Sequence, residues 1–228
     1  RSTLFPYTTL FRSSIVVLYS HPNPQRVLII GGGDLGVARE VLKHKCVETI
    51  DLCDIDEKVT ELSKKYLPHL TEAASKDPRL HLYFEDGAAY VGTKENYYDI
   101  VITDSTDPIG PAESIFNKAY YQNVLKCLRP GGIICSQGEN IWLDADVIIN
   151  LRNIFKEVGF KDVEYAIIQL PTYTFGSIGC LVGSMGGSCK KPRREMTKEE
   201  KDSMKYYSKE IHESAFVMPE FFRKKFEG

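Results

Sequence analysis

Residues 26–36 read RVLIIGGGDLG, an apolar, β-branched run followed by three glycines and an aspartate. Such a run predicts an interior strand of a parallel sheet, and a glycine turn that opens a helix directly after it is typical of folds that bind dinucleotides or S-adenosyl compounds. A second run, YYDIVITD at residues 97–104, has the same character and ends in Asp104. Because ligands of open α/β sheets bind just beyond the carboxyl ends of the strands, the two runs predict one site with acidic side chains.

Strand and helix signals alternate from residue 26 onward, which predicts a parallel sheet with crossover helices. We expect strands at residues 26–30, 48–53, 80–84, 98–103, 132–136, 162–168 and 179–182. Helices are expected at residues 36–44, 57–66, 117–128 and 144–158. The 228 residues, 43% of them hydrophobic, are enough for one well-filled α/β domain.

The composition excludes several classes of protein. The chain has 29 basic and 31 acidic residues, so no overall field favours nucleic acid or an anionic membrane surface. No apolar stretch approaches the roughly 20 residues that span a bilayer. The six cysteines have no CxxC spacing, and we expect them to be reduced in a cytoplasmic protein. The five histidines show no ligand spacing, so no metal is expected.

Both ends of the chain differ in pattern from the middle. Residues 4–13 read LFPYTTLFRS and look like the translation of a sequencing adaptor, so we expect residues 1–13 to be a non-native leader, although a native hairpin is the alternative. The main domain is then expected at residues 14–186. Residues 187–228 are expected to form a linker, with a solvated basic run at 190–194, and a helical tail that packs on the domain.

Three further acidic positions follow the expected strands. Asp34 beside the glycine turn would oppose the carboxylate of S-adenosylmethionine but would hold the bare ammonium of the decarboxylated form; a helix cap without a ligand is the alternative. Asp54 ends the second strand, where a carboxylate can bond ribose hydroxyls or can cap the next helix. Asp86, with Gly87, follows the third strand and could reach an adenine edge or form a simple turn.

The sequence DSTDP at residues 104–108 adds chemistry to this rim. An alkylamine has a pKa of about 10.4, so its neutral form costs about 4–5 kcal/mol at pH 7. Asp104 could accept a proton from an attacking amine as a general base, and Asp107 could hold a distal ammonium. The alternative is a turn in which both aspartates cap the loop before Pro108.

Seven segments together resemble the spermidine synthase family, the aminopropyltransferases: SHPNPQRVLIIGGGD, DLCDIDEKV, YDIVITDSTDPIGPAESIF, YYQNVLKCLRPGG, SQGENIW, PTYTFGSIG and KYYSKEIHESAFVMPEFFRK. The resemblance runs from about residue 20 to the C-terminus. It implies a class I methyltransferase-like Rossmann fold, an α/β fold with a mostly parallel seven-stranded sheet and helices on both faces. It also implies transfer of an aminopropyl group from decarboxylated S-adenosylmethionine, a co-substrate, to putrescine, without a cofactor or a metal.

The resemblance also implies roles for individual residues. The donor-binding set is Gly31, Gly33, Asp34, Asp54, Asp86, Gly87 and Asp104, with Asp104 as the catalytic base. The putrescine-binding set is Asp107, Gln137, Trp142 and Tyr173. The implied partners are these small molecules alone, in a cytoplasmic homodimer or homotetramer.

Three departures from the family pattern leave other functions open. Leu35 stands where the family usually has glycine, and a leucine would strain a conformation with positive φ. Asp54 replaces the usual glutamate, and the family's small N-terminal β domain is expected to be missing from this chain. A putrescine N-methyltransferase and a catalytically inert nucleoside-binding fragment are therefore the alternatives to a spermidine synthase.

Overall fold

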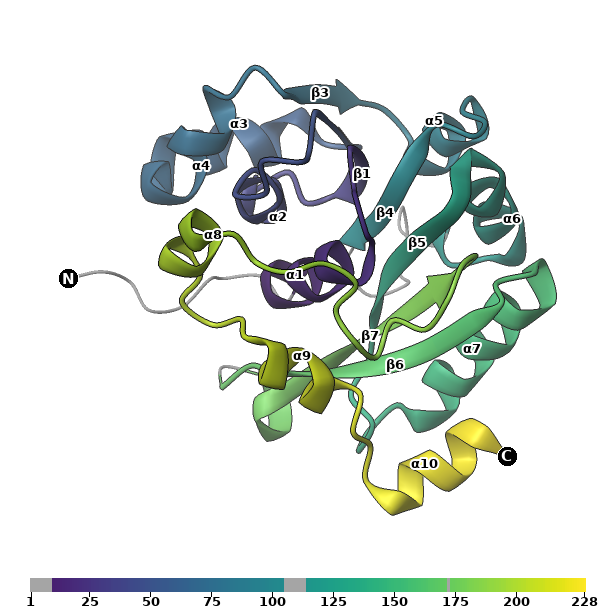
Figure 1. Cartoon of the computed structure of the whole chain (residues 1–228). Coiled ribbons are helices and arrows are strands. Elements are labelled where there is room, and N and C mark those ends of the chain that lie inside the picture. The colour runs from purple at the N-terminus through teal and green to yellow at the C-terminus, as the bar shows by residue number, and fades with distance from the viewer. Residues whose placement is uncertain (1–9, 105–113, 172) are drawn as a thin grey trace.

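The computed structural model describes residues 10–104, 114–171 and 173–228. Seven strands form one sheet in the order β3-β2-β1-β4-β5-β7-β6 (Figure 1). The strands are β1 (Arg26–Gly31), β2 (Thr49–Asp54), β3 (Leu80–Phe84), β4 (Tyr98–Asp104), β5 (Leu128–Gly138), β6 (Asp162–Gln169) and β7 (Ser177–Ser184). The α/β class and the mostly parallel sheet predicted from the sequence are confirmed.

The chain changes direction across the sheet between β1 and β4. Strands β1 to β5 run parallel to one another, and β7 enters antiparallel between β5 and β6. From β1 the chain continues outward to β2 and β3 on one side of the sheet. From β4 it continues to β5, β6 and β7 on the other side. The carboxyl ends of β1 and β4 therefore flank a topological switch point, where open α/β sheets bind ligands.

Helices cover both faces of the sheet (Figure 1). One apolar core lies beneath α1 (Leu10–Ser20), α2 (Gly36–Val41), α4 (Pro68–Ser75) and α9 (Lys209–Ala215). The other lies beneath α5 (Gly87–Gly92), α6 (Lys118–Cys127), α7 (Ala145–Val158) and α10 (Glu220–Glu227). Three further helices are α3 (Glu57–Tyr66), the short η2 (Thr174–Gly176) and α8 (Lys198–Ser203).

Helix α1 is the largest difference from the predicted elements. No element was predicted before residue 26, yet α1 spans Leu10–Ser20 and every residue from Ser13 to Ser20 is buried. The expected boundary after residue 13 therefore falls inside a helix. The sequence SIVVLYS lacks the polar face of a surface helix because residues 13–20 are all buried, so its periodicity does not predict a helix.

The C-terminal segment packs on both faces of the sheet. Cys189, Tyr207 and Phe216 enter the core beneath α1, and Phe222 and Phe226 enter the core beneath α7. The basic run at 190–194 is only partly solvated, because Arg194 is half-buried against Glu200 of α8. No helix in the described part of the chain is both long and apolar enough to cross a membrane.

Candidate active site

The glycine turn and the end of β4 meet at the switch point. Gly31 and Asp104 are paired in the parallel register of β1 and β4, so the turn at residues 31–33 lies directly beside the Asp104 carboxylate. Gly32 has a φ of +68°, and a methyl group added to it would lie 3.1 Å from Oδ2 of Asp104. Glycine is therefore required here both by the backbone conformation and by the close approach of the carboxylate.

Asp104 is held in an unusual environment. Its Oδ2 atom is buried and accepts no hydrogen bond from the described residues. Burial, together with the nearby charges of Asp34 and Asp54, raises the pKa of Asp104 from 3.8 to about 8. A buried carboxylate oxygen without a donor is costly, so this geometry favours either a proton or a cationic ligand at Oδ2.

Asp54 joins the glycine turn to the start of α3. Its Oδ2 accepts a hydrogen bond from the Gly33 amide at 2.8 Å, and its Oδ1 accepts one from the Asp56 amide at 2.9 Å. A methyl group at Gly33 would lie 2.7 Å from Oδ2 of Asp54, closer than real side chains come. Each oxygen keeps a second lone pair, so the carboxylate can still accept a hydrogen bond from a hydroxyl group of a ligand.

Asp34 lies one residue before Leu35, the N-cap of α2. Its Oδ1 accepts a hydrogen bond from the Gly36 amide at 2.9 Å, and burial raises its pKa. The next residue, Leu35, has a φ of 62° and is fully buried. The expected strain at Leu35 is thus present, because a left-handed backbone conformation is unfavourable for a leucine.

Asp86 lies at the neighbouring strand end and is exposed. Its Oδ1 accepts a hydrogen bond from the Ala88 amide at 2.8 Å, which makes it the N-cap of α5. Gly87 is packed so tightly that a methyl group would lie 2.5 Å from Cγ2 of Ile30. Asp86 therefore caps a helix, which was the alternative to a ligand contact. Only its Oδ1 takes part in the cap.

The predicted amine-binding residues lie in and after β5 and before β7. Gln137 is half-buried near the carboxyl end of β5, and Tyr173 is half-buried at the N-cap of η2. Asp107 lies outside the described residues. The roles of Gln137, Tyr173 and Asp107 in binding an amine stay predictions.

Asn140 connects these two segments and was not predicted as a site residue. Its side-chain amide donates hydrogen bonds to the carbonyls of Thr174 at 3.1 Å and Ser177 at 2.7 Å, and its Oδ1 accepts one from the Trp142 amide. Asn140 is fully buried. The two carbonyls that accept from its side-chain amide are more than 30 residues away along the chain, so no local pattern identifies this contact.

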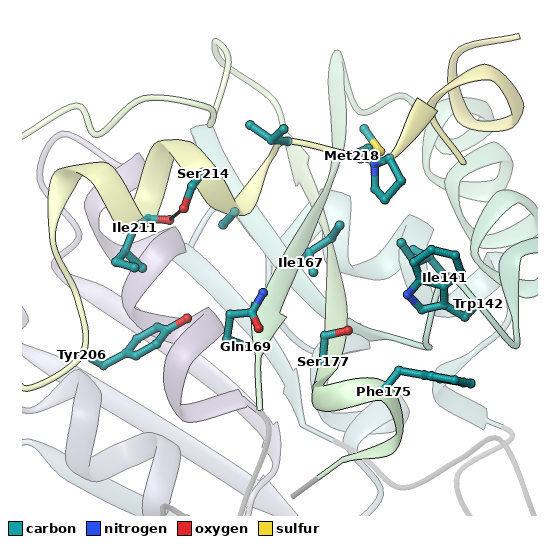
Figure 2. A pocket seen from close by; sticks show the side chains of 13 residues that line it. Ile141, Trp142, Ile167, Gln169, Phe175, Ser177, Tyr206, Ile211, Ser214 and Met218 are labelled. Atoms are coloured by element: carbon teal, nitrogen blue, oxygen red, sulfur yellow. Dashed lines mark hydrogen bonds between the residues drawn. The ribbon is translucent and has the colours of Figure 1, made fainter. Parts of the chain in front are cut away.

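Trp142 faces a different hollow from the carboxylates. With Phe175 it lines a cavity of about 470 Å³ at the end of β6, and Ile211 and Tyr206 close the opposite side (Figure 2). The Trp142 ring also packs on Phe221 at 4.7 Å between ring centroids. The described lining of this cavity includes neither Gln137 nor Tyr173, and a role of Trp142 in the putrescine pocket stays a prediction.

Comparisons with known proteins agree with this geometry. The family model of the spermine/spermidine synthase domain matches residues 13–191. A spermidine synthase of Dictyostelium discoideum is 46% identical over 210 residues, which are 92% of this chain and 73% of that protein. A spermine synthase of Saccharomyces cerevisiae is 42% identical over 212 residues, which are 90% of this chain and 70% of that protein.

Solved structures give the same result. A crystal structure of spermidine synthase in complex with the transition state analogue AdoDATO matches with a TM-score of 0.84 and 31% identity, over 95% of this chain and 75% of that chain. The spermidine synthase of Thermotoga maritima matches with a TM-score of 0.82 at the same identity. The resemblance found in the sequence motifs is confirmed. The chain therefore belongs to the spermine/spermidine synthase family, whose members are aminopropyltransferases.

Proposed function

We propose that this chain transfers the aminopropyl group of decarboxylated S-adenosylmethionine to putrescine, which yields spermidine and methylthioadenosine. The observation that carries this proposal is the buried Oδ2 of Asp104, which accepts no hydrogen bond from the described residues and lies near two further carboxylates. Such a rim favours a ligand that carries an ammonium over one that carries a carboxylate. This argues for the decarboxylated donor and against S-adenosylmethionine.

The reaction balances with Asp104 as the base. The neutral amine nitrogen of putrescine attacks the methylene carbon bound to the sulfonium, the new C–N bond forms, and the C–S bond breaks with its electron pair moving to sulfur. The resulting secondary ammonium passes a proton to the Asp104 carboxylate. A substrate cation beside Asp104 offsets the repulsion from Asp34 and Asp54, so binding lowers the pKa of Asp104 from about 8 and prepares it as a base.

The division of the site supports two binding roles. The glycine turn, Asp34 and Asp54 form the donor half, with Asp86 toward the adenine. Gln137, in β5, and Tyr173, at the N-cap of η2, are proposed to bind the acceptor amine, and the family resemblance gives Asp107 the same proposed role. The proposal includes no resident cofactor, because the sulfonium of the donor already activates the carbon that is attacked.

Location and assembly belong to the same proposal. The six cysteines are free, which suits a reducing compartment such as the cytoplasm. Homodimers or homotetramers are proposed from the family resemblance. Light scattering of the purified chain at micromolar concentration tests the assembly.

Asp104→Asn tests the role of the base. We expect methylthioadenosine to bind the variant within about threefold of the parent, while spermidine formation falls about 100-fold or more, because only the proton acceptor is lost. Calorimetry with methylthioadenosine and a product assay with putrescine and the decarboxylated donor measure both quantities. Equal turnover in the variant would contradict the role of Asp104.

The same assay separates the proposal from its competitors. Transfer of a methyl group from S-adenosylmethionine to putrescine would identify an N-methyltransferase. Nucleoside binding without any transfer would identify an inert binding module. Neither result is expected.

A further inference from the structure

Thr60 of α3 contacts the glycine turn at Gly33. Its hydroxyl donates a hydrogen bond of 2.8 Å to the Gly33 carbonyl, and its side chain is buried. A methyl group at Gly33 would lie 3.2 Å from the Thr60 hydroxyl oxygen, so hydroxyl and turn are in direct contact. No local motif connects these two residues, which are 27 positions apart.

The Gly33 residue is therefore held at both of its polar backbone groups. Its N–H donates to Asp54, and its carbonyl accepts from Thr60. Asp54 also accepts from the amide of Asp56, the N-cap of the helix that carries Thr60. The contacts form a closed ring that runs from the turn through Asp54 into α3 and back through Thr60.

Helix α3 has little else to fix it to the turn. Its buried residues are Thr60 and Ser63, and its larger apolar side chains Val59, Leu62 and Tyr66 are exposed. A buried hydroxyl at the contact point thus replaces the apolar stripe that usually attaches a surface helix. Loss of this hydroxyl would leave the Gly33 carbonyl buried without its side-chain donor.

We propose that Thr60 is a positioning residue for the donor half of the site: its hydroxyl fixes the glycine turn against Asp54 and thereby sets the carboxylate that receives the nucleoside. Thr60 itself does not touch the reacting atoms. The inference rests on the proposed function, because it assigns the nucleoside of the donor to this turn.

The test compares three variants of the whole chain. Thr60→Val keeps the shape of the side chain and removes the donor, Thr60→Ser keeps the donor, and Ser63→Ala removes the other buried hydroxyl of α3. The Ser63 hydroxyl makes no described hydrogen bond to the turn, so Ser63→Ala is the matched control. Calorimetry with methylthioadenosine measures the dissociation constant of each variant.

Thr60→Val is expected to raise the dissociation constant of methylthioadenosine about 5–10-fold, the scale of one buried hydrogen bond. Thr60→Ser and Ser63→Ala are expected to stay within about twofold of the parent. In the transfer assay, Thr60→Val should raise KM for the decarboxylated donor, with kcat and KM for putrescine unchanged. An unchanged dissociation constant in Thr60→Val, or an equal rise in Ser63→Ala, would overturn the assignment.

Hydrogen exchange of the Gly33 amide decides the inference independently of binding. We expect faster exchange in Thr60→Val than in the parent and in Thr60→Ser, because the ring opens when the carbonyl is released. Equal exchange rates would overturn the positioning role even if the parent binds nucleoside. The parent could instead bind no nucleoside while the Gly33 amide still exchanges faster in Thr60→Val. In that case the proposed function is wrong, but the positioning of the turn by Thr60 is supported. Should Thr60→Val not fold, Thr60→Ala provides the same comparison with a smaller side chain.

Discussion

At the scale of single residues, the site is built from side chains and backbone conformations that reduce stability. The Oδ2 atom of Asp104 is buried without a described donor, and Leu35 occupies a left-handed conformation. Unfavourable features of this kind persist where the surrounding structure holds them, and they concentrate at functional sites. Both features lie within the same switch point, next to the glycine turn.

Asp104→Asn should make the protein more stable at alkaline pH. The Asp104 carboxyl has a pKa of about 8 in the folded protein and 3.8 as its unperturbed value. Within this window the folded state holds a proton that the unfolded chain has lost, so the free energy of unfolding falls as pH rises. An asparagine at this position takes up no proton, so the variant should be about 1–3 kcal/mol more stable than the parent at pH 8.5 and no more stable than the parent below about pH 4.

Urea unfolding of both proteins between pH 4 and pH 8.5 measures this difference. The expected gain in stability is smaller than the full effect of the pKa shift. The reason is that the buried asparagine amide itself lacks hydrogen-bond partners, which lowers the stability of the variant at every pH. A difference that does not change with pH would show that the Asp104 carboxyl is not protonated in the folded, unliganded protein.

Leu35→Gly should destabilise the protein although it removes strain. Release from the left-handed conformation is worth about 1–2 kcal/mol. Loss of the fully buried leucine side chain costs about 2–5 kcal/mol, so the core term dominates and the net loss is about 1–3 kcal/mol. Asn96→Gly is the control, because Asn96 also has a positive φ but is exposed, and its free energy of unfolding should change by less than about 0.5 kcal/mol. A stabilised Leu35→Gly would mean that strain outweighs packing.

At the scale of elements, local patterns predicted most of the sheet and few of the contacts within the site. The β-branched runs predicted β1 to β4 within one residue at each end, and the amphipathic pattern predicted α3 at its observed bounds. The strand ends also placed Asp34, Asp54 and Asp104 together, because parallel strands bring their carboxyl ends to one edge. Thr60 and Asn140 could not be predicted, since each acts through contacts with residues distant in sequence.

The prediction failed for elements whose conformation depends on tertiary contacts. The helix α1 has a β-branched apolar sequence, and the short α5 contains glycine at both ends. Neither has the periodicity of an isolated amphipathic helix, and packing against the sheet decides their conformation. Amphipathic periodicity requires one polar and one apolar helix face, so it cannot identify a helix that is buried on all sides.

Leu18→Ala tests whether α1 is an integral part of the core. Leu18 is fully buried in the core beneath α1, so the substitution should reduce the free energy of unfolding by about 2–5 kcal/mol. Leu62→Ala in α3 makes the same chemical change at an exposed position and should cost less than about 1 kcal/mol. Equal effects in chemical denaturation would show that α1 is not packed in the folded protein.

At the scale of the whole molecule, a buried ionic cluster joins α1 to the segment that follows β7. Arg194 donates two hydrogen bonds of 3.0 Å to the Glu200 carboxylate, and its guanidinium lies 4.1 Å from the centre of the Tyr19 ring. Tyr19 in α1 stacks on Tyr207 at 4.4 Å, and His44 after α2 contacts both Arg194 and Glu200. The cluster thereby attaches the C-terminal segment to α1 and α2 on one face of the sheet (Figure 1).

Arg194→Met should show that this attachment is cooperative with the fold. The Glu200 side chain is only 3% exposed, so removal of the cation leaves a buried charge and should cost about 3–5 kcal/mol in urea unfolding. Lys76→Met is the control, because Lys76 and Glu72 pair on the surface and their interaction is worth about 0–1 kcal/mol. The double variant Arg194→Met, Glu200→Gln removes the orphaned charge and should recover part of the loss, which a simple packing defect at residue 194 would not permit. If the single and double variants are equally unstable, the cluster stabilises the C-terminal segment through shape alone and its charges contribute nothing.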